Sequence, residues 1–332
     1  MKASPIDQPV QRMAVIGAGA MGISLAATLA QSVPVVMVVR RRSVAARIAS
    51  EGIRVSGLGD AYARPIVVPD IESLTSQAPL NAIFVATKTT AIDDVASRLQ
   101  PIITSLGASH PPFVVSFQNG IESGHELSER MGHDRVLRMV LNYGARLSTE
   151  TEAEVTLSHP PHAIGGPDGR FFEMASHLAH LLTLGGMESE PVENIEPFVW
   201  KKGIVNASMN PVAALMNASV GEVLDSPARS VVANLLAEGI GVADREGIPL
   251  GVDAEQKSWD MLEAARPHTP SMVEDIRAGR MTEVGQLNRQ VIAHALRLGI
   301  SVPCHETVSA LIEAFDWRVF RASRGSAQSL QH

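Results

Sequence analysis

The chain has 332 residues, of which 45% are hydrophobic and 19% are charged, and its formal net charge is −7. A chain of this length usually forms two domains, each large enough to bury a core. The negative charge argues against a nucleic-acid partner, which favours a basic surface. The single cysteine, Cys304, permits no internal disulfide and fits a reducing compartment. Neither Cys304 nor the 11 histidines have the spacing of a metal site, so we expect no bound metal.

The N-terminal segment, Met1 to Arg12, is polar and lacks the apolar core of a signal peptide. The next stretch, Met13 to Val39, is almost uncharged and could be mistaken for a membrane span. Its glycines, the polar pair Gln31-Ser32 and the helix-breaking Pro34 argue against a span. A buried strand–helix–strand unit explains both the hydrophobicity and these breaks. We therefore expect a cytoplasmic protein with no membrane partner.

In chain order, short apolar runs alternate with helical patterns. Met13 to Ile16 predicts a strand, and the Ala- and Leu-rich stretch Ala20 to Ala30 predicts a helix. Val35 to Val39 predicts a second strand, and Ser43 is expected to cap a helix over Val44 to Ser50. Further apolar runs of this kind are Ala82 to Ala86 and Phe113 to Phe117. Strands that alternate with helices predict a parallel sheet covered on both faces.

The second half of the chain is different. Val136 to Ala145 predicts a strand and turn, and Glu154 to Leu157 and His162 to Gly165 predict a pair of strands around Pro160-Pro161. Phe171 to Leu184 predicts a helix ended by two glycines. Strand signals almost vanish beyond Pro191, and from Ile195 to Phe320 the pattern is helical. We therefore predict two domains, residues 1–192 and residues 193–332.

Three glycines after the first strand form the pattern G-x-G-x-x-G between a strand and a helix, which is typical of dinucleotide binding. Gly17 allows a sharp turn, Gly19 allows the backbone to approach a pyrophosphate, and Gly22 allows the helix to pack closely on the strand. The helix N-terminus offers free N–H groups to phosphate. The alternative is a glycine-rich structural turn. The predicted cofactor contacts here are Gly17, Ala18, Gly19, Ala20, Met21 and Gly22.

The end of the second strand indicates which nicotinamide cofactor binds. An NAD enzyme usually has Asp or Glu there, whereas this chain has Arg40, Arg41 and Arg42 and no acid until Glu51. A guanidinium binds a 2′-phosphate that a carboxylate would repel. We therefore predict NADP(H), with Arg40 as the first candidate because it lies nearest the strand. A solvated basic cluster is the alternative, and which of the three arginines binds the phosphate is left open.

Five groups of residues occur in an order that is similar to one family. They are Gly17 to Gly22 with Arg40; Ala86-Thr87-Lys88; Gln118-Asn119-Gly120; Trp200-Lys201-Lys202 with Asn206 and Asn210-Pro211; and Ser271 to Asp275 with Gly279 to Glu283 and Asn288. With them the chain resembles the ketopantoate reductase family (2-dehydropantoate 2-reductase) from Met13 to about Ala314.

The resemblance implies an α/β fold, with an N-terminal Rossmann doubly wound parallel sheet followed by an all-helical C-terminal domain like that of 6-phosphogluconate dehydrogenase. It implies NADPH-dependent reduction of 2-dehydropantoate (ketopantoate) to (R)-pantoate in pantothenate biosynthesis, on the route to coenzyme A. The implied partner is a small 2-keto acid. A homodimer is left open, because helices rich in small residues and Met, such as Ala207 to Val220, suit an interface as well as a core.

Lys202, Asn206 and Asn210 are four residues apart, which places them on one side of a helix. Burying a lysine is costly and lowers its pKa toward neutrality, which suits a general acid. We therefore predict Lys202 as the catalytic acid and both asparagines as substrate contacts. The alternatives are an ion pair of Lys202 with Glu283 and a hydrogen-bond network between helices. Lys201 does not share the spacing of the asparagines.

Four further residues complete the predicted site. Ser271 is expected to cap a helix that begins near Val273 and to bind the substrate carboxylate, unless it is only a cap. The resemblance implies that Glu283 is a catalytic carboxylate that orients the substrate hydroxyl and the lysine. The alternative is a solvated carboxylate with no such role. The resemblance also implies that Asn119 contacts cofactor and substrate and that Lys88 contacts cofactor. Both follow apolar strands, whose carboxyl ends bind ligands in open parallel sheets.

One segment, Leu147 to Gly166, departs from the simple hairpin of many family members, and it is expected to border the substrate pocket. Three alternatives therefore stay open. The first is a paralogous NADP-dependent reductase of another 2-keto acid or of a ketone. The second is a 3-hydroxyacid dehydrogenase of the 6-phosphogluconate type. The third is a non-catalytic NADPH-sensing module, which need not keep the lysine, the pair of asparagines and the acid, namely Lys202, Asn206, Asn210 and Glu283.

Overall fold

The computed structural model describes residues 12–106 and 111–329. The polar N-terminal segment, residues 1–11, lies outside the described residues. No helix in the described ranges is both long enough and apolar enough to cross a membrane.

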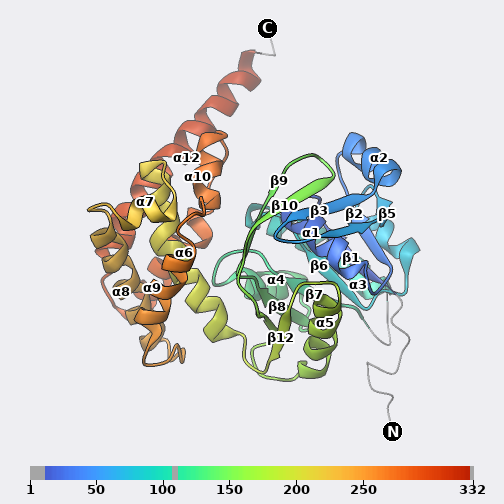
Figure 1. The fold of residues 1–332 in the computed structure, drawn as a ribbon, viewed down its shortest axis with the longest axis horizontal. Helices are drawn as coiled ribbons and strands as arrows, with labels where there is room; N and C mark the ends of the chain where they lie inside the picture. Colours follow the sequence, from blue (N-terminus) through green and yellow to red (C-terminus); the bar gives the residue numbers. More distant parts are fainter. Residues whose placement is uncertain (1–11, 107–110, 330–332) are drawn as a thin grey trace. The chain divides into compact units, whose positions relative to one another are not determined.

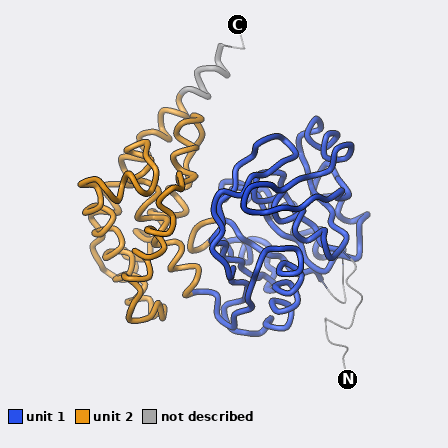
Figure 2. The backbone as a smooth tube through the Cα atoms, in the orientation of Figure 1, with its two compact units in different colours: residues 1–118, 123–196 blue, residues 119–122, 197–332 orange. Residues whose placement is uncertain are grey.

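The chain divides into two compact units (Figure 2). Unit 1 comprises residues 1–118 and 123–196, and unit 2 comprises residues 119–122 and 197–332. The short segment 119–122 therefore groups with unit 2, although its neighbours on both sides in the sequence belong to unit 1. The predicted domain boundary at residue 192 stays a prediction.

Among the described residues, unit 1 contains an eight-stranded sheet of order β12-β11-β8-β7-β6-β1-β2-β5 (Figure 1). Its strands are β1 (Met13–Ile16), β2 (Val35–Val38), β5 (Ile66–Val68), β6 (Ala82–Val85), β7 (Phe113–Ser116), β8 (Val136–Val140), β11 (His162–Gly165) and β12 (Ser189–Val192). Six neighbouring strands, β5, β2, β1, β6, β7 and β8, are parallel. Their order is that of a dinucleotide-binding Rossmann sheet. The predicted fold of this half is confirmed.

Helices cover both faces of this sheet, because side chains of a strand point alternately to its two sides. The helices of unit 1 are α1 (Ala20–Leu29), α2 (Arg42–Glu51), α3 (Ile92–Leu106), α4 (Ser123–Met131) and α5 (Phe172–Leu184), with short 3₁₀ turns η1 (Glu72–Gln77) and η2 (Thr89–Ala91). Met13 and Val15 of β1 pack in one core with α1 and α5. Ala14 and Ile16 pack on the other side with α3 and α4.

A second sheet explains why the stretch from Met13 to Val39 is so apolar. Within the described ranges it has four strands in the order β4-β3-β10-β9. They are β3 (Ile53–Gly57), β4 (Ala61–Ala63), β9 (Tyr143–Leu147) and β10 (Glu152–Ser158). Helix α1 contacts strands of both sheets, so every residue from Gly22 to Leu29 is buried. A helix enclosed on all sides is apolar on all sides.

Three details of the sequence analysis were wrong or incomplete. The stretches expected to pair around Pro160-Pro161 are in different sheets: β10 pairs with β3 and β9, whereas β11 pairs with β8 and β12. Their burial explains this, because β11 is buried throughout and β10 alternates. Ser43 does not cap α2, because the helix already begins at Arg42. The strands β3, β4, β5 and β12 were not predicted, and the stretch expected to form one strand and a turn contains β8 and the start of a second strand, β9.

Unit 2 contains no strand among its described residues, which confirms the predicted all-helical half. Its elements are α6 (Glu196–Met216), whose first residue belongs to unit 1, then α7 (Val220–Leu224), α8 (Arg229–Arg245), α9 (Ala254–Ala264), α10 (Ser271–Arg277), the 3₁₀ turn η3 (Val284–Gln286), α11 (Asn288–Leu298) and α12 (Pro303–Ser329). Most side chains of α6 from Gly203 to Ala214 are buried. The small residues of this helix therefore build the core, and a homodimer stays a prediction.

A buried asparagine supplies a hydrogen bond that the backbone of α6 lacks near its centre. Pro211 has no N–H, so it cannot donate to the carbonyl of Ala207 one turn earlier. Asn288 Nδ2 donates to that carbonyl at 2.8 Å and lies 3.0 Å from His305 Nδ1. Burial lowers the pKa of His305 to about 4, so its ring is neutral and Nδ1 can accept, while Nε2 donates to the Leu235 carbonyl at 3.0 Å. The network keeps α6 continuous past Pro211.

Candidate functional site

The glycine-rich turn after β1 has the shape that a dinucleotide requires. Gly17 has a φ of +115°, and a Cβ there would lie 2.9 Å from the Ala86 carbonyl oxygen. A Cβ on Gly22 would lie 2.2 Å from the Gly17 carbonyl oxygen. A Cβ on Gly19 would meet no described atom within 4 Å, so the backbone faces open space before the first turn of α1. This combination of tight packing and open space fits a pyrophosphate group.

The three arginines after β2 are not equivalent. Arg41 forms an ion pair with Glu150 at 3.3 Å, and Arg47 of α2 reaches the other oxygen of Glu150 at 3.4 Å. Arg40 is exposed and follows β2 by two residues, while Arg42 is the first residue of α2. Since Glu150 already shares the charge of Arg41, the contacts favour Arg40 or Arg42 for a phosphate.

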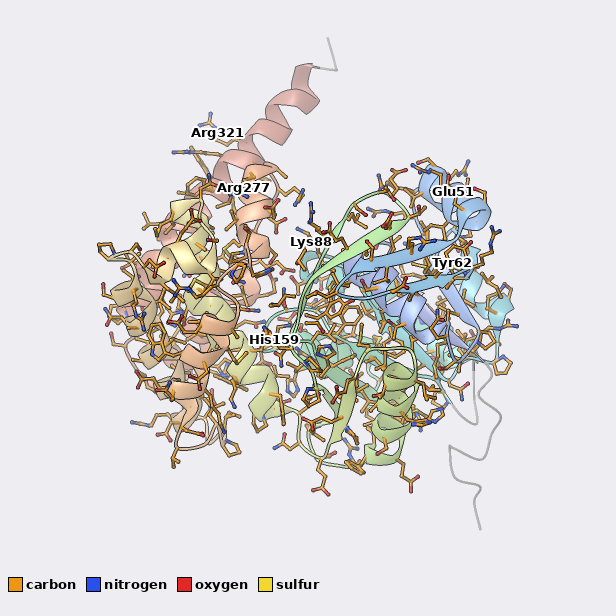
Figure 3. The ribbon with its side chains drawn as sticks, in the orientation of Figure 1. Glu51, Tyr62, Lys88, His159, Arg277 and Arg321 are labelled. Carbon is orange, nitrogen blue, oxygen red and sulfur yellow. The ribbon has the colours of Figure 1, made fainter. Side chains whose placement is uncertain are left out.

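The loop after β6 is fixed by the residue that follows the neighbouring strand β7. Lys88 is exposed at the start of η2 (Figure 3). Gln118 Nε2 donates to the carbonyl oxygens of Thr87 at 3.1 Å and Lys88 at 3.2 Å. The carboxyl ends of β6 and β7 are adjacent in the sheet, so this amide ties together two loops at the edge where open parallel sheets generally bind ligands. Sequence reasoning had noted Gln118 in a motif but had given it no role.

The predicted polar stripe lies on one helix. Lys202 and Asn206 are half-buried on α6, and Asn210 is only 7% exposed. The residues between Asn206 and Asn210 are all buried, so the helix is enclosed around its polar positions. For the neighbouring Lys201, burial and then the nearby charge of Lys257 lower the pKa. Lys201 lies off the stripe, on the side of the Lys257–Asp253 ion pair.

Two predicted site residues meet in unit 2. Asn119 Nδ2 donates to Glu283 Oε2 at 3.0 Å, across 164 positions of sequence. The residue before Glu283 is anchored as well: Thr282 donates through its backbone N and its Oγ1 to the two carboxylate oxygens of Asp316 on α12, both at 2.8 Å. Glu283 is therefore fixed by its neighbour in the chain and by Asn119. Sequence reasoning missed Asp316.

Ser271 lies elsewhere in unit 2, on α10. It is exposed and is the first residue of the helix, with Pro270 in the N-cap position. The expectation that Ser271 is the N-cap is wrong, because the helix begins two residues before Val273. Pro270 has the extended backbone of a cap residue, and its carbonyl accepts from Val273 N at 3.0 Å.

Sequence reasoning also missed a set of side chains that hold the segment 119–122. They are Gln290 and His294, which are four residues apart and therefore share one side of α11. Glu122 is the acidic partner in the segment itself. The helical spacing of these polar residues was the signal available in the sequence.

Comparisons with known proteins agree with this architecture. A family model described as ketopantoate reductase PanE/ApbA matches residues 13–165, and its C-terminal counterpart matches residues 194–316. The 2-dehydropantoate 2-reductase of Archaeoglobus fulgidus is 30% identical over 312 residues, which cover 92% of this chain and 98% of that protein. The chain belongs to the ketopantoate reductase family.

Solved structures share its fold. The 2-dehydropantoate 2-reductase from Geobacter metallireducens has a TM-score of 0.77 at 25% identity, and the match covers 91% of this chain and 99% of that one. D-mandelate dehydrogenase with NADH and anilino(oxo)acetate has a TM-score of 0.81 at 19% identity, covering 93% and 99%. Membership of the ketopantoate reductase family confirms the resemblance, the fold class and an oxidoreductase acting on a CH–OH group.

Proposed function

We propose that the chain reduces a 2-keto acid with NADPH, with 2-dehydropantoate (ketopantoate) as the preferred substrate and (R)-pantoate as the product. The observation that carries the proposal is in unit 2, where the half-buried Lys202 and Asn206 continue into the buried Asn210 on one helix, and Asn119 is bonded to Glu283. The whole-length similarity to proteins named 2-dehydropantoate 2-reductase supports the choice of substrate. The reaction would be a step of pantothenate biosynthesis.

Unit 1 would hold the cofactor. The turn from Gly17 to Gly22 and the N-terminus of α1 would bind the pyrophosphate, because backbone N–H groups and the helix dipole favour a dianion there. Arg40 would bind the 2′-phosphate of NADPH, and Lys88 would lie near the cofactor. When bound, the nicotinamide supplies the hydride for the keto carbon.

Unit 2 would supply the acid and the contacts that orient the substrate. The Lys202 ammonium would donate a hydrogen bond to the keto oxygen and then its proton, as negative charge builds there. Asn206 and Asn210 would hold the substrate's polar groups, and Ser271 would bind its carboxylate. Glu283, held by Asn119, would accept a hydrogen bond from the substrate hydroxyl and orient Lys202.

The cofactor arm of the proposal is tested by replacing single arginines. Arg40→Ala should raise the KM for NADPH about tenfold and leave the KM for NADH nearly unchanged, because a charge-assisted bond to the phosphate is lost. Arg41→Ala is the matched control, since Arg41 pairs with Glu150. If Arg40→Ala leaves the NADPH KM unchanged while an Arg42→Ala variant raises it, the assignment moves to Arg42.

The substrate is tested by following NADPH and NADH absorbance with ketopantoate, aliphatic 2-keto acids and phenylglyoxylate in parallel. The proposal expects ketopantoate with NADPH to have the highest kcat/KM. A higher value for an aromatic keto acid would identify a paralogue instead. Oxidation of 6-phosphogluconate with NADP⁺ would favour the 3-hydroxyacid dehydrogenase alternative, and tight NADPH binding with no turnover would favour a sensor.

A further inference from the structure

The segment 119–122 is bound along η3 and α11 at every position. Gly120 has a φ of +100°, and a Cβ there would lie 2.7 Å from the Gln286 carbonyl oxygen, so only glycine allows this approach. Gln290 Oε1 accepts from the backbone N of Ile121 at 2.7 Å and from that of Glu122 at 3.1 Å. With Asn119 on Glu283, each residue of the segment has a contact within unit 2.

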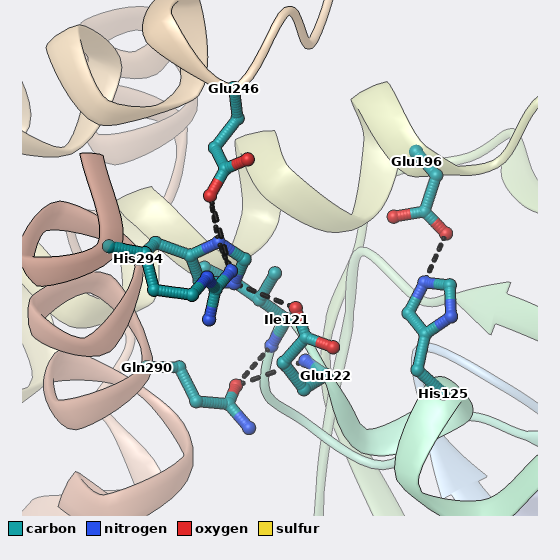
Figure 4. A network of polar contacts seen from close by, with 8 residues as sticks. Ile121, Glu122, His125, Glu196, Glu246, Gln290 and His294 are labelled. Carbon is teal, nitrogen blue, oxygen red and sulfur yellow. Dashed lines mark hydrogen bonds and ion pairs between the residues drawn. The ribbon is translucent and has the colours of Figure 1, made fainter. Parts of the chain in front are cut away.

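The far end of the segment is held by a buried histidine (Figure 4). His294 is 5% exposed, and its Nε2 lies 2.7 Å from Glu122 Oε1. Its Nδ1 contacts Oε1 of Glu246, the residue in the C-cap position of α8. The edge of the Trp200 ring packs against the imidazole, with ring centroids 4.7 Å apart. One imidazole therefore bridges two carboxylates that are far apart in the sequence.

The charges around the ring favour its protonated form. Burial alone would lower the pKa of His294, but the hydrogen bonds to Glu122 and Glu246 outweigh burial and raise the pKa above 6.5. The charge of Arg297 acts the other way; its Nη2 lies 3.2 Å from Glu246 Oε1 and 2.6 Å from His294 Nδ1. The bridge is a network of ion pairs, in which His294 pairs with Glu122 and Glu246 and Arg297 pairs with Glu246.

We propose that His294 is a positioning residue of the reductase: by bridging Glu122 to Glu246 it holds residues 119–122 along α11 and thereby holds Asn119 on Glu283. The inference rests on the proposed roles of Asn119 and Glu283. A protonated imidazole donates to both carboxylates, whereas a neutral ring donates to only one. Glu122 is three residues from Asn119, so loosening Glu122 releases the end of a short, otherwise fully bound segment.

The kinetic test uses His294→Gln, whose amide can bond one carboxylate but carries no charge and cannot bridge both. The kcat for ketopantoate with NADPH should fall about tenfold, and the same substitution in an Asn119→Ala background should produce no further loss, because His294 acts through Asn119. Two losses that multiply would overturn the proposal, since His294 would then act independently of Asn119.

A matched control lies in unit 1, where His125 Nε2 contacts Glu196 Oε1 at 3.1 Å on an exposed surface (Figure 4). His125→Gln removes a similar contact and should keep kcat within about twofold, as surface ion pairs contribute little. A second pair of variants covers the case in which His294→Gln does not fold. Glu122→Gln keeps an acceptor for Nε2–H and should keep most of the activity, whereas Glu122→Ala should lose it.

Hydrogen exchange separates failure of this inference from failure of the proposed function, because it needs no substrate. In His294→Gln, or in Glu122→Ala, the amides of Ile121 and Glu122 should exchange at least about tenfold faster, while amides of the α6 core stay protected. If the variants exchange faster but the wild type does not turn over ketopantoate, the role of the His294 bridge is kept and the proposed substrate is rejected. Unchanged exchange at residues 121–122 would overturn the inference, whatever the substrate is.

Discussion

Two buried histidines of unit 2 respond to pH in opposite directions. His305 has a pKa of about 4 because burial disfavours its charged form, whereas His294 has a raised pKa because Glu122 and Glu246 bond it. His305 must be neutral to accept from Asn288, and His294 must be charged to bridge two acids. The neutral form of His305 stabilises the core of α6, and the charged form of His294 stabilises the segment that carries Asn119.

The lowered pKa of His305 predicts acid-sensitive stability. The unfolded chain binds a proton below pH 6.5, but the folded chain binds it only near pH 4, so the contribution of His305 is complete above pH 6.5 and is lost as the pH falls toward 4. In urea unfolding, the free energy of unfolding should fall between pH 7 and pH 4 by about 3 kcal/mol more for the wild type than for His305→Asn. Parallel curves for the two proteins would contradict a neutral, buried His305.

For His294 the dependence of stability on pH has the opposite sign. A raised folded pKa gives stability that is complete below pH 6.5 and is lost as the pH rises through the folded value. Exchange of the Ile121 and Glu122 amides, corrected for the intrinsic effect of pH, should therefore increase from pH 6 to pH 9 in the wild type. In His294→Gln the corrected exchange should be fast and independent of pH. A wild-type profile as flat as that of the variant would show that this imidazole does not titrate in the range.

The residues of the site could be predicted where their relation is local. Lys202, Asn206 and Asn210 are a helical repeat apart, so their common helix follows from spacing alone. The bridge of Glu122 to His294 could not be predicted, because it joins positions 172 apart and depends on how the segment 119–122 folds. The cap role of Ser271 failed for a small reason: Pro270 can occupy the cap position itself.

At the scale of elements, helix α6 depends on a side-chain donor that takes the place of a missing backbone N–H. Asn288 supplies to Ala207 the hydrogen bond that Pro211 cannot give. The amide of Asn288 is fully buried, so its loss leaves the Ala207 carbonyl without this donor in the core. The continuity of the helix that carries Asn206 and Asn210 follows from this contact.

This dependence predicts a rescue. Asn288→Ala should lower the free energy of unfolding by about 1–3 kcal/mol, because a buried carbonyl loses its partner. Adding Pro211→Ala restores a backbone N–H at the right position in the helix, so the double variant should recover part of the loss and of the activity. Urea unfolding and kcat for the four proteins of this cycle provide the measurement. A double variant less stable than Asn288→Ala would contradict the explanation.

Strands of the Rossmann sheet were predictable because those covered on both faces are continuous apolar runs, as in β1, β2, β6 and β7. The short strands β3 and β4 were missed because each buries only two alternate residues, too few for the alternation to stand out in the sequence. The assignment of β10 and β11 to one pair was wrong because sheet membership is set by distant partners, here β3 and β8.

For the whole molecule, the division into two units separates the predicted roles. The glycine turn, Arg40 and Lys88 belong to unit 1, while Lys202 and Glu283 belong to unit 2. Periodicity could predict this division of strands from helices. It could not predict that the segment 119–122 belongs to unit 2, because that membership depends on the contacts with η3 and α11.

Cofactor binding should therefore stabilise the units unequally. NADPH at about 100 times its Kd should stabilise the unit that binds it by about 2.7 kcal/mol. When NADPH is added, hydrogen exchange on the whole chain should slow more in β1, α1 and β2 than in α8 and α9. A Gly19→Val variant, which fills the open space above the turn, should lose this protection without a change in fold. Equal protection of both units would contradict a cofactor site in unit 1.

The kcat of Lys202→Ala for ketopantoate with saturating NADPH, measured beside the wild type and Lys201→Ala, is the most direct test of the central claim. Loss of the general acid should lower kcat roughly 10²–10⁴-fold with NADPH affinity unchanged, while Lys201→Ala should stay close to the wild type. A Lys202→Ala variant that keeps near-normal turnover, or a wild-type chain that does not oxidise NADPH with ketopantoate, would contradict the claim.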